Sequence, residues 1–188
     1  MAGNTASGNI EGFIWIAMNS FQHTALTFVG QHIGAKKVNK LPKIILLNVL
    51  FVSITGISIA LCTIIFRYPL LSLYLDDASI IETAIDRLLV IATTYFICGI
   101  MDVLTGSLRG LGSSMVPMVL TVVSVCGVRI AWVLTIFKAL RATEYAHIVL
   151  YVCYPASWIV AVISMSVATV ILYKRIKRNP IYAECYQR

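Results

Sequence analysis

Five long and almost uninterrupted apolar stretches constrain the fold of this chain more than any other feature of its sequence. Each is long enough to cross a bilayer as an α-helix, which takes about 20 residues. They are continuous, whereas a membrane-spanning strand would show alternating apolar residues over about ten positions. The sequence therefore predicts an all-α polytopic membrane protein with five transmembrane helices. The predicted spans are residues 12–33, 43–66, 80–105, 114–137 and 146–173.

The composition agrees with a chain that lies mostly in lipid. Hydrophobic residues make up 59% of the sequence and charged residues 12%, against about half and about a quarter in typical soluble proteins. The net charge of +7 would suggest nucleic acid in a soluble protein, but the basic residues cluster between the apolar stretches and form no stripe with interleaved aromatic side chains. We therefore expect the lipid bilayer, and not nucleic acid, as a partner.

The basic residues also predict an orientation in the membrane, because cytoplasmic loops are rich in Lys and Arg. A basic cluster follows the first stretch, and another follows the last. The second connection is more acidic than basic, which places it outside, and the fourth is ambiguous. We expect an outside N-terminus and a cytoplasmic C-terminus, with residues 179–188 as a cytoplasmic tail. The clusters are Lys36, Lys37, Lys40 and Lys43, and Lys174, Arg175, Lys177 and Arg178.

Polar side chains recur along one face of the first stretch. Ser20, Thr24, Thr27 and Gln31 follow one another at steps of three or four residues, which places them on one side of a helix. In lipid, such a face turns toward other helices or toward a water-filled cavity, and both readings stay open. Thr24, Thr27 and Gln31, with Asn48 of the second stretch, are therefore candidates for a cavity wall.

Two ionisable residues, Asp102 and Arg129, lie inside apolar stretches. A charge at the centre of the bilayer costs on the order of 3 kcal/mol, and such residues mark proton or cation sites in many membrane proteins. Asp102 is a candidate coupling residue, unless it pairs with Arg109 near the membrane surface. We expect Arg129 to face the bundle interior and to bind backbone carbonyl groups, the alternative being contact with an anionic substrate or a coupling carboxylate.

Glycines predict two further features. A GxxxG pair in the first stretch, Gly30 and Gly34, predicts a close approach of two helices. Glycines around Arg109 predict a tight turn with positive φ, which would hold Arg109 as a structural clamp. No GxxxxGK motif follows and no strand precedes this turn, so it does not indicate a nucleotide site. The glycines of the predicted turn are Gly106, Gly110 and Gly112.

Nothing in the sequence indicates an enzyme. The chain has no GxSxG and no HExxH motif, and its three histidines are not spaced as metal ligands. We therefore expect no catalytic residue, no metal ligand and no bound cofactor.

Four segments together point to one known family. Residues 8–15, GNIEGFIW, and 27–37, TFVGQHIGAKK, resemble the start and the end of that family's eighth helix. Residues 101–118, MDVLTGSLRGLGSSMVPM, resemble the end of its tenth helix and an LRGxG loop, and 126–132, CGVRIAW, is similar to the eleventh helix of bacterial members. The family is that of the multidrug and toxic compound extrusion (MATE) transporters, and the resemblance covers about residues 8–178.

The resemblance implies that residues 1–178 form helices eight to twelve of a twelve-helix transporter, an incomplete six-helix lobe. It implies a cation-coupled antiporter that exports drugs or other cationic or amphipathic compounds across the plasma membrane, with Na⁺ or H⁺ as the coupling ion. Such a lobe would need the N-terminal lobe or a partner chain, so we expect this chain to be inactive alone. In some members an acid of the tenth helix binds the cation, but Cys98 stands at that position here, so Asp102 does not carry over as the same site. Gly34, Arg109, Gly110, Gly112 and Arg129 are expected to be structural residues of the shared motifs.

Two alternatives remain at this point. One is a lipid-linked precursor flippase of the same superfamily, which would need several basic residues in a cavity, and Arg129 is the one candidate. The other is a truncated membrane protein that does not transport, such as an assembly partner.

Overall fold

The computed structural model describes residues 2–72, 78–137 and 146–179 of the chain. Most of the predicted tail lies outside the described residues. So do charged residues of the second and fourth connections on which the predicted orientation partly depends: Asp76, Asp77, Lys138, Arg141 and Glu144.

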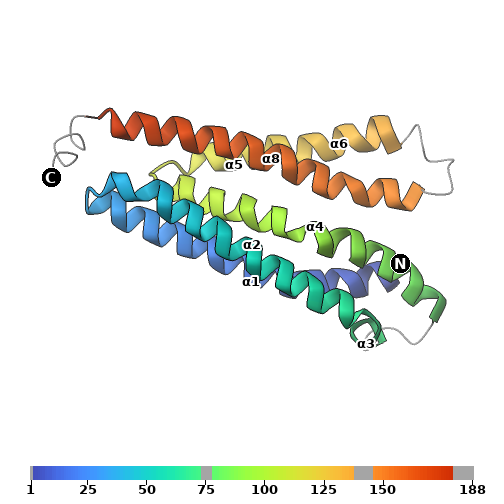
Figure 1. The fold of residues 1–188 in the computed structure, drawn as a ribbon. Coiled ribbons are helices and arrows are strands. Elements are labelled where there is room, and N and C mark those ends of the chain that lie inside the picture. Colours follow the sequence, from blue (N-terminus) through green and yellow to red (C-terminus); the bar gives the residue numbers. More distant parts are fainter. Residues whose placement is uncertain (1, 73–77, 138–145, 180–188) are drawn as a thin grey trace.

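The described part of the chain is helical, with short connections and no strand, which confirms the prediction of an all-α protein. Residues 115–137 form one continuous helix, in which the π-helical stretches η2 and η3 alternate with the α-helical stretches α5 and α6. The helices are α1 (Ala2–Gly34), η1 (Val38–Lys40), α2 (Leu41–Ile65), α3 (Arg67–Ser72), α4 (Ala78–Gly110), α5 (Met115–Thr121), η2 (Val122–Gly127), α6 (Val128–Trp132), η3 (Val133–Phe137) and α8 (Ala146–Lys177) (Figure 1).

Among the described residues, four helical segments are long and apolar enough to cross a membrane, namely Val38–Ile65, Leu88–Gly110, Met115–Ile136 and Val152–Lys177. They coincide with four of the five predicted spans. The remaining predicted span, residues 12–33, is also helical as part of α1, but it is not one of these four. The polar side chains along α1 lower its mean hydropathy and account for this difference.

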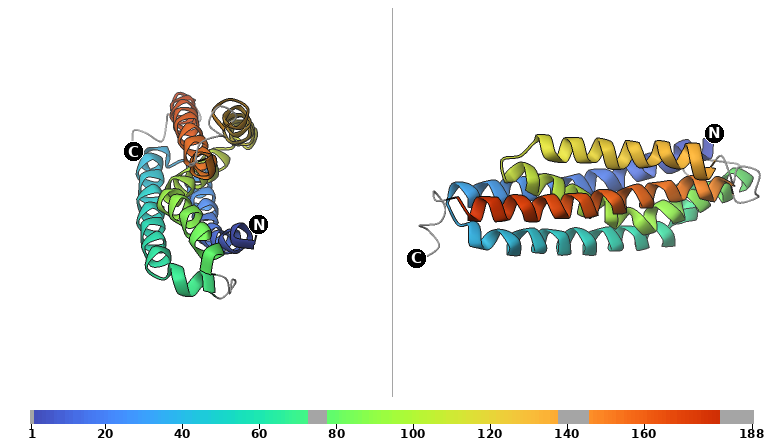
Figure 2. Two further views of the ribbon diagram at one scale, coloured as in Figure 1. Left: turned by 90° about the vertical axis from the view of Figure 1, so that its right-hand side faces the viewer. Right: turned by 90° about the horizontal axis from the view of Figure 1, so that it is seen from above.

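The central helix of the bundle is α4, which has α1 and α2 on one side and α8 with the 115–137 helix on the other (Figures 1 and 2). Every residue of α4 from 101 to 108 is buried. Large core side chains of the neighbouring helices pack against it, among them Met18 of α1, Val52 of α2 and Met165 of α8. A helix that is apolar on nearly all sides is stable only when other helices or lipid surround it, which explains the central place of α4.

Glycines on one face of α4 allow α1 to approach closely. A Cβ atom at Gly106 would clash with the backbone carbonyl oxygen of Gln22 in α1. A Cβ atom at Gly110 would lie 2.8 Å from Cβ of Val29 and 2.9 Å from the carbonyl oxygen of Leu26. Gly106 and Gly110 themselves form a GxxxG pair, the motif with which membrane helices bring their backbones together.

The predicted close contact at Gly30 and Gly34 is not found within the described part of the chain, where no other helix has an atom within 4 Å of a Cβ built at either residue. The GxxxG pair that makes the contact is on α4 and not on α1. The two pairs look alike in the sequence, and the structure separates them because close approach depends on what the partner helix presents.

The tight turn predicted around Arg109 is displaced, because α4 continues through Gly106 and Arg109 to Gly110. Of the three glycines, only Gly112 has positive φ, at +87°. Its N–H donates to the carbonyl of Arg109 at 3.0 Å, and the N–H of Ser113 donates to that of Leu108 at 3.1 Å. This pair of bonds is the Schellman motif that ends many helices.

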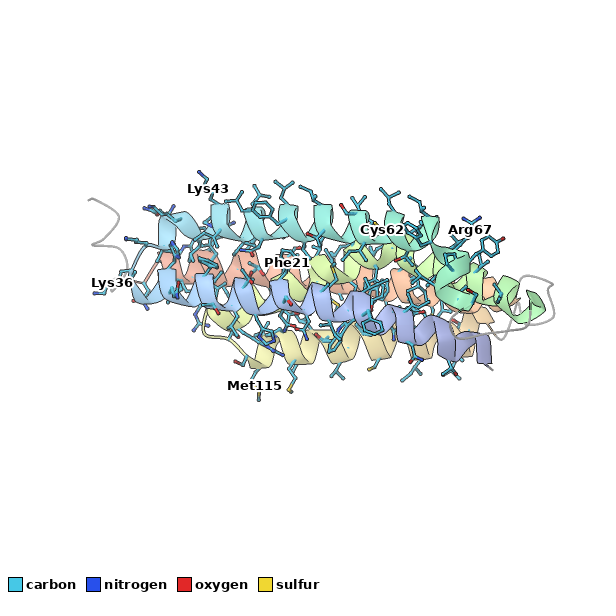
Figure 3. All side chains as sticks on the ribbon, turned by 90° about the horizontal axis from the view of Figure 1, so that it is seen from below. Phe21, Lys36, Lys43, Cys62, Arg67 and Met115 are labelled. Carbon is cyan, nitrogen blue, oxygen red and sulfur yellow. The ribbon has the colours of Figure 1, made fainter. Side chains whose placement is uncertain are left out.

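The described ends of three helices meet at one end of the bundle. The apolar side chains of Val38, Leu41, Leu111, Tyr173 and Ile176 share a small cluster there, and they come from the α1–α2 connection, the α4–α5 turn and the last part of α8. We call this the basic end, because exposed basic side chains from all three segments gather at it (Figure 3). They are Lys36, Lys37, Lys40, Lys43, Arg109, Lys174, Arg175, Lys177 and Arg178.

Candidate functional site

Predicted site residues of α1 lie on a face that no other described helix covers. Thr27 and Gln31 are exposed, and Thr24 is half-buried. The hydroxyl of Thr24 donates to the carbonyl of Ser20 at 2.9 Å, and that of Thr27 donates to the carbonyl of His23 at 2.9 Å. These five residues, Ser20, His23, Thr24, Thr27 and Gln31, form what we call the polar stripe.

Asn48 does not lie on the same surface as the polar stripe. It is buried on the side of α2 that also buries Val52 and Gly56. Its amide donates to the carbonyl of Ile44, one turn earlier, at 3.0 Å. A side chain that is bonded within its own helix and packed between helices is more typical of a structural contact than of a cavity wall.

Asp102 is buried in the middle of the bundle, with 8% of its surface exposed. Its Oδ2 atom has no hydrogen-bond partner within the described part of the chain. Nearby hydroxyl groups are already used, since Thr105 donates to the carbonyl of Met101 at 2.9 Å and Ser107 donates to that of Val103 at 2.8 Å. Unlike these two hydroxyl groups, Oδ2 of Asp102 has no hydrogen-bond partner in its own helix.

The alternative was that Asp102 pairs with Arg109. In the described structure, Oδ2 of Asp102 accepts no hydrogen bond from Arg109. Arg109 is exposed in the last turn of α4, at the basic end. A cation at this position interacts favourably with the partial negative charge of the helix C-terminus. Arg109 is thus favoured at the helix end, and it interacts with Asp102 through its charge but without a hydrogen bond to Oδ2.

The face of α4 that carries Asp102 is directed partly toward α8. Tyr95, seven residues earlier, contacts Trp158 of α8 edge to face at 5.5 Å between ring centroids. Thr105, three residues later, lies 3.3 Å from the sulfur of Met165 in α8. Residues at these spacings share one side of a helix, so Asp102 lies close to the α4–α8 contact.

Arg129 also faces the bundle, but its partners are on α8. Its Nε donates to the hydroxyl of Ser157 at 3.3 Å, and its guanidinium lies 4.2 Å from the centroid of the Tyr154 ring. Ser157 is fully buried and donates in turn to the carbonyl of Tyr154 at 2.8 Å. The expected interior position is thus seen, although a hydroxyl and an aromatic face take the place of the expected carbonyl groups.

These contacts belong to a longer polar seam between the 115–137 helix and α8. The hydroxyl oxygens of Ser124 in η2 and Ser164 in α8 lie 3.3 Å apart and share a hydrogen bond. The segment that carries Arg129 lies between the two π-helical stretches, and such stretches are frequent at functional sites. Ser157 and Ser164 are seven residues apart in the sequence, which indicates a shared helix face, but their partners across the seam were not predictable.

Replacing Arg129 by lysine is expected to lower the free energy of unfolding by about 1–2 kcal/mol. The substitution keeps the positive charge in the membrane but removes the planar group that lies over Tyr154 and the Nε–H that reaches Ser157. Thermal unfolding in detergent measures the change. Tyr154→Phe, which keeps the ring face, is the control and should change stability by less than about 0.5 kcal/mol; equal losses in both variants would contradict the assignment.

The arrangement can offer one buried carboxylate to a cation or a proton. Within the ranges that the structure describes, no three His, Cys, Asp or Glu side chains come together as a multidentate metal site would require. A single carboxylate in an apolar setting suits a monovalent ion or a proton.

Comparison with known proteins gave two matches that concern most of the chain. The model of the family described as MatE matches residues 1–135. The probable multidrug resistance protein YoeA of Bacillus subtilis (strain 168) is 24% identical over 136 residues, a stretch that covers 72% of this chain and 29% of that relative. The chain is therefore similar to less than a third of a much longer protein. No solved structure matches it.

Proposed function

Since this chain belongs to the MatE family, whose model matches residues 1–135, we propose that it forms part of a secondary active efflux transporter of the plasma membrane. The proposed activity is the export of drugs or other cationic or amphipathic compounds in exchange for Na⁺ or H⁺. A relative named as a multidrug resistance protein supports this class of substrate. Because the match covers 29% of that relative, we further propose that these 188 residues do not transport by themselves and act together with an N-terminal lobe or a partner chain.

The observation that carries this proposal is the polar stripe of α1. Elsewhere the uncovered helix faces are mostly apolar, as membrane-facing surfaces are: Leu46 and Ile54 of α2 and Ile163 of α8 are 54–69% exposed. The polar stripe instead exposes Ser20, His23, Thr27 and Gln31. Since polar side chains are disfavoured against lipid tails, this face suits a water-filled path between two lobes.

Asp102 is the proposed coupling residue. An alternating-access transporter changes between inward-open and outward-open states, and an ion shifts this equilibrium only if it binds one state more tightly. A carboxylate whose Oδ2 lacks a partner in the described structure would be stabilised by a cation or proton in whichever state admits one. Such a group meets the condition for coupling, whereas the hydroxyl groups around it already have partners.

The proposed orientation places the basic end in the cytoplasm. The basic residues of three separate segments gather there, as expected for cytoplasmic loops. In this orientation the N-terminus lies outside the cell and the C-terminus lies in the cytoplasm. The position of Arg129 gives no support to a flippase, because its guanidinium is engaged with α8 and is not free in a cavity.

A transport assay in liposomes tests the proposal. The chain alone and the chain joined to the N-terminal part of the Bacillus subtilis relative are reconstituted, and ethidium movement is followed under an imposed Na⁺ or H⁺ gradient. We expect gradient-dependent transport from the joined protein and none above empty liposomes from the chain alone. In the joined protein, Asp102→Asn is expected to lower transport at least about tenfold, because the coupling carboxylate is lost. Transport by the chain alone, or unchanged transport in the variant, would contradict the respective part of the proposal.

A further inference from the structure

A groove of about 250 Å³ lies between α2 and α8, with Leu104 of α4 among its lining residues. Ile45, Leu46 and Val49 line it on one side and Val170 and Tyr173 on the other. Leu46 and Val170 are 69% and 51% exposed, so the groove opens on the outer surface of the described bundle. It is separate from the polar stripe and from the seam that holds Arg129.

The groove has the character of a site for a hydrocarbon chain. Its lining is mostly apolar, and its side-chain hydroxyl groups belong to Ser166, Thr169 and Tyr173. That of Thr169 donates to the carbonyl of Met165 at 2.8 Å. Pockets for drug-sized molecules measure roughly 300–1,000 Å³ and place a few polar groups to fix the ligand. A smaller groove with a mostly apolar lining and no charged lining residue suits a single acyl chain.

Positive charge flanks this groove where it approaches the basic end. Lys43 lies one turn before Leu46 on α2, and Lys174 lies one turn after Val170 on α8. Residues at these spacings share a helix face, so each lysine continues the groove wall on its helix. Both lysines are exposed, and Figure 3 shows Lys43 projecting from α2 near this end.

We propose that this groove is a binding site for an anionic phospholipid. One acyl chain lies between α2 and α8, against Leu46, Val49 and Val170, and the headgroup phosphate lies between Lys43 and Lys174. The charge complementarity selects the headgroup, because each lysine near an anionic lipid contributes roughly a fivefold gain in affinity. The apolar lining holds the chain but does not distinguish one lipid from another.

Lipid retention by the purified chain tests the headgroup part of the proposal. The chain is delipidated in detergent and mixed with equal amounts of phosphatidylglycerol and phosphatidylcholine that carry the same acyl chains, and bound lipid is measured by native mass spectrometry. We expect phosphatidylglycerol to be preferred by about 25-fold, and each of Lys43→Gln and Lys174→Gln to lower the preference about fivefold. Lys36→Gln is the matched control and should leave the preference unchanged, because Lys36 is an exposed lysine at the same end but lies on neither of the two helices that form the groove walls. Equal retention of both lipids, or an equal loss in the control, would overturn the proposal.

A second pair of variants tests the groove itself. Val49→Trp fills the groove and is expected to lower the retention of both lipids at least fivefold. Val123→Trp, on the exposed face of η2, should leave retention unchanged. If Val49→Trp does not fold, Val170→Trp makes the same test at a more exposed position. Full retention in a folded, filled variant would place the lipid elsewhere, and displacement of phosphatidylglycerol by inorganic phosphate would show a headgroup site without a chain site. Either result would refute the groove assignment while leaving the transport proposal untouched.

Discussion

Replacing Gly106 by alanine is expected to destabilise the chain by about 2 kcal/mol or more. The added Cβ would clash with the carbonyl oxygen of Gln22, a backbone atom that cannot rotate away as a side chain can. Alanine gains up to about 1 kcal/mol over glycine from helix propensity. Forcing α1 away from α4 costs more packing energy than this gain, because the contact of α4 with α1 is more extensive than its contact with any other described helix. For a chain of this size, the thermal midpoint should fall by about 4–8 °C.

The same substitution at Gly30 is the matched control. Among the described residues, no other helix has an atom within 4 Å of a Cβ at Gly30, so only the gain in helix propensity remains, and the midpoint should rise slightly. Gly99→Ala should fall between the two, because the atoms in its way belong to the side chains of Val52 and Met18, which can move. A Gly106 variant as stable as the Gly30 variant would show that the two helices do not approach as described.

The long helices were predictable from the sequence because lipid imposes one simple requirement on every residue that faces it. An apolar stretch of about 20 residues has few alternatives to a membrane helix. The helices of the structure accordingly overlie all five predicted stretches. The polar character of α1 was predictable for the same reason, since a row of hydroxyl and amide groups at helical spacing stands out in an apolar chain.

Contacts between helices were much less predictable, because they depend on two segments at once. The sequence offers three GxxxG pairs, at residues 8 and 12, 30 and 34, and 106 and 110. Within the described residues, a close partner is found for Gly106 and Gly110 and not for Gly30 and Gly34. Likewise, the sequence shows Arg129 as a buried charge, but not that Tyr154 and Ser157 receive it. Helical spacing indicates which residues share a face, and it does not indicate which face of another helix they meet.

The displaced turn has a related cause. Glycine is compatible with positive φ, so a group of three glycines around Arg109 predicts a turn at that residue. In the structure, two of the glycines serve helix packing and only Gly112 serves the turn. The turn after α1 shows the opposite case. There Lys36, which is not a glycine, has a positive φ of 57°. Glycine thus serves either close helix packing or a turn with positive φ, and the sequence alone does not show which.

Replacing Asp102 by asparagine is expected to stabilise the purified chain by about 1–3 kcal/mol at alkaline pH, where a carboxyl group is most readily ionised. An ionised carboxylate that is buried without a partner is unfavourable, and the amide has the same shape without the charge. The reason for expecting a gain is that Oδ2 has no hydrogen-bond partner in the described structure. Thermal unfolding in detergent, with choline as the only added cation, measures it.

Two comparisons decide what the carboxylate of Asp102 does. Arg109→Gln should change stability by less than about 0.5 kcal/mol, because Arg109 is exposed and not bonded to Oδ2; a large loss would restore the ion pair as the explanation.

Exchanging choline for Na⁺ should raise the midpoint of the unmodified chain and leave that of Asp102→Asn unchanged if this carboxylate binds Na⁺. If Na⁺ has no effect while acidification stabilises only the unmodified chain, the coupling ion is H⁺. A destabilised Asp102→Asn would mean that the carboxylate already has a partner in the folded chain, and its proposed role in coupling would then have no physical basis.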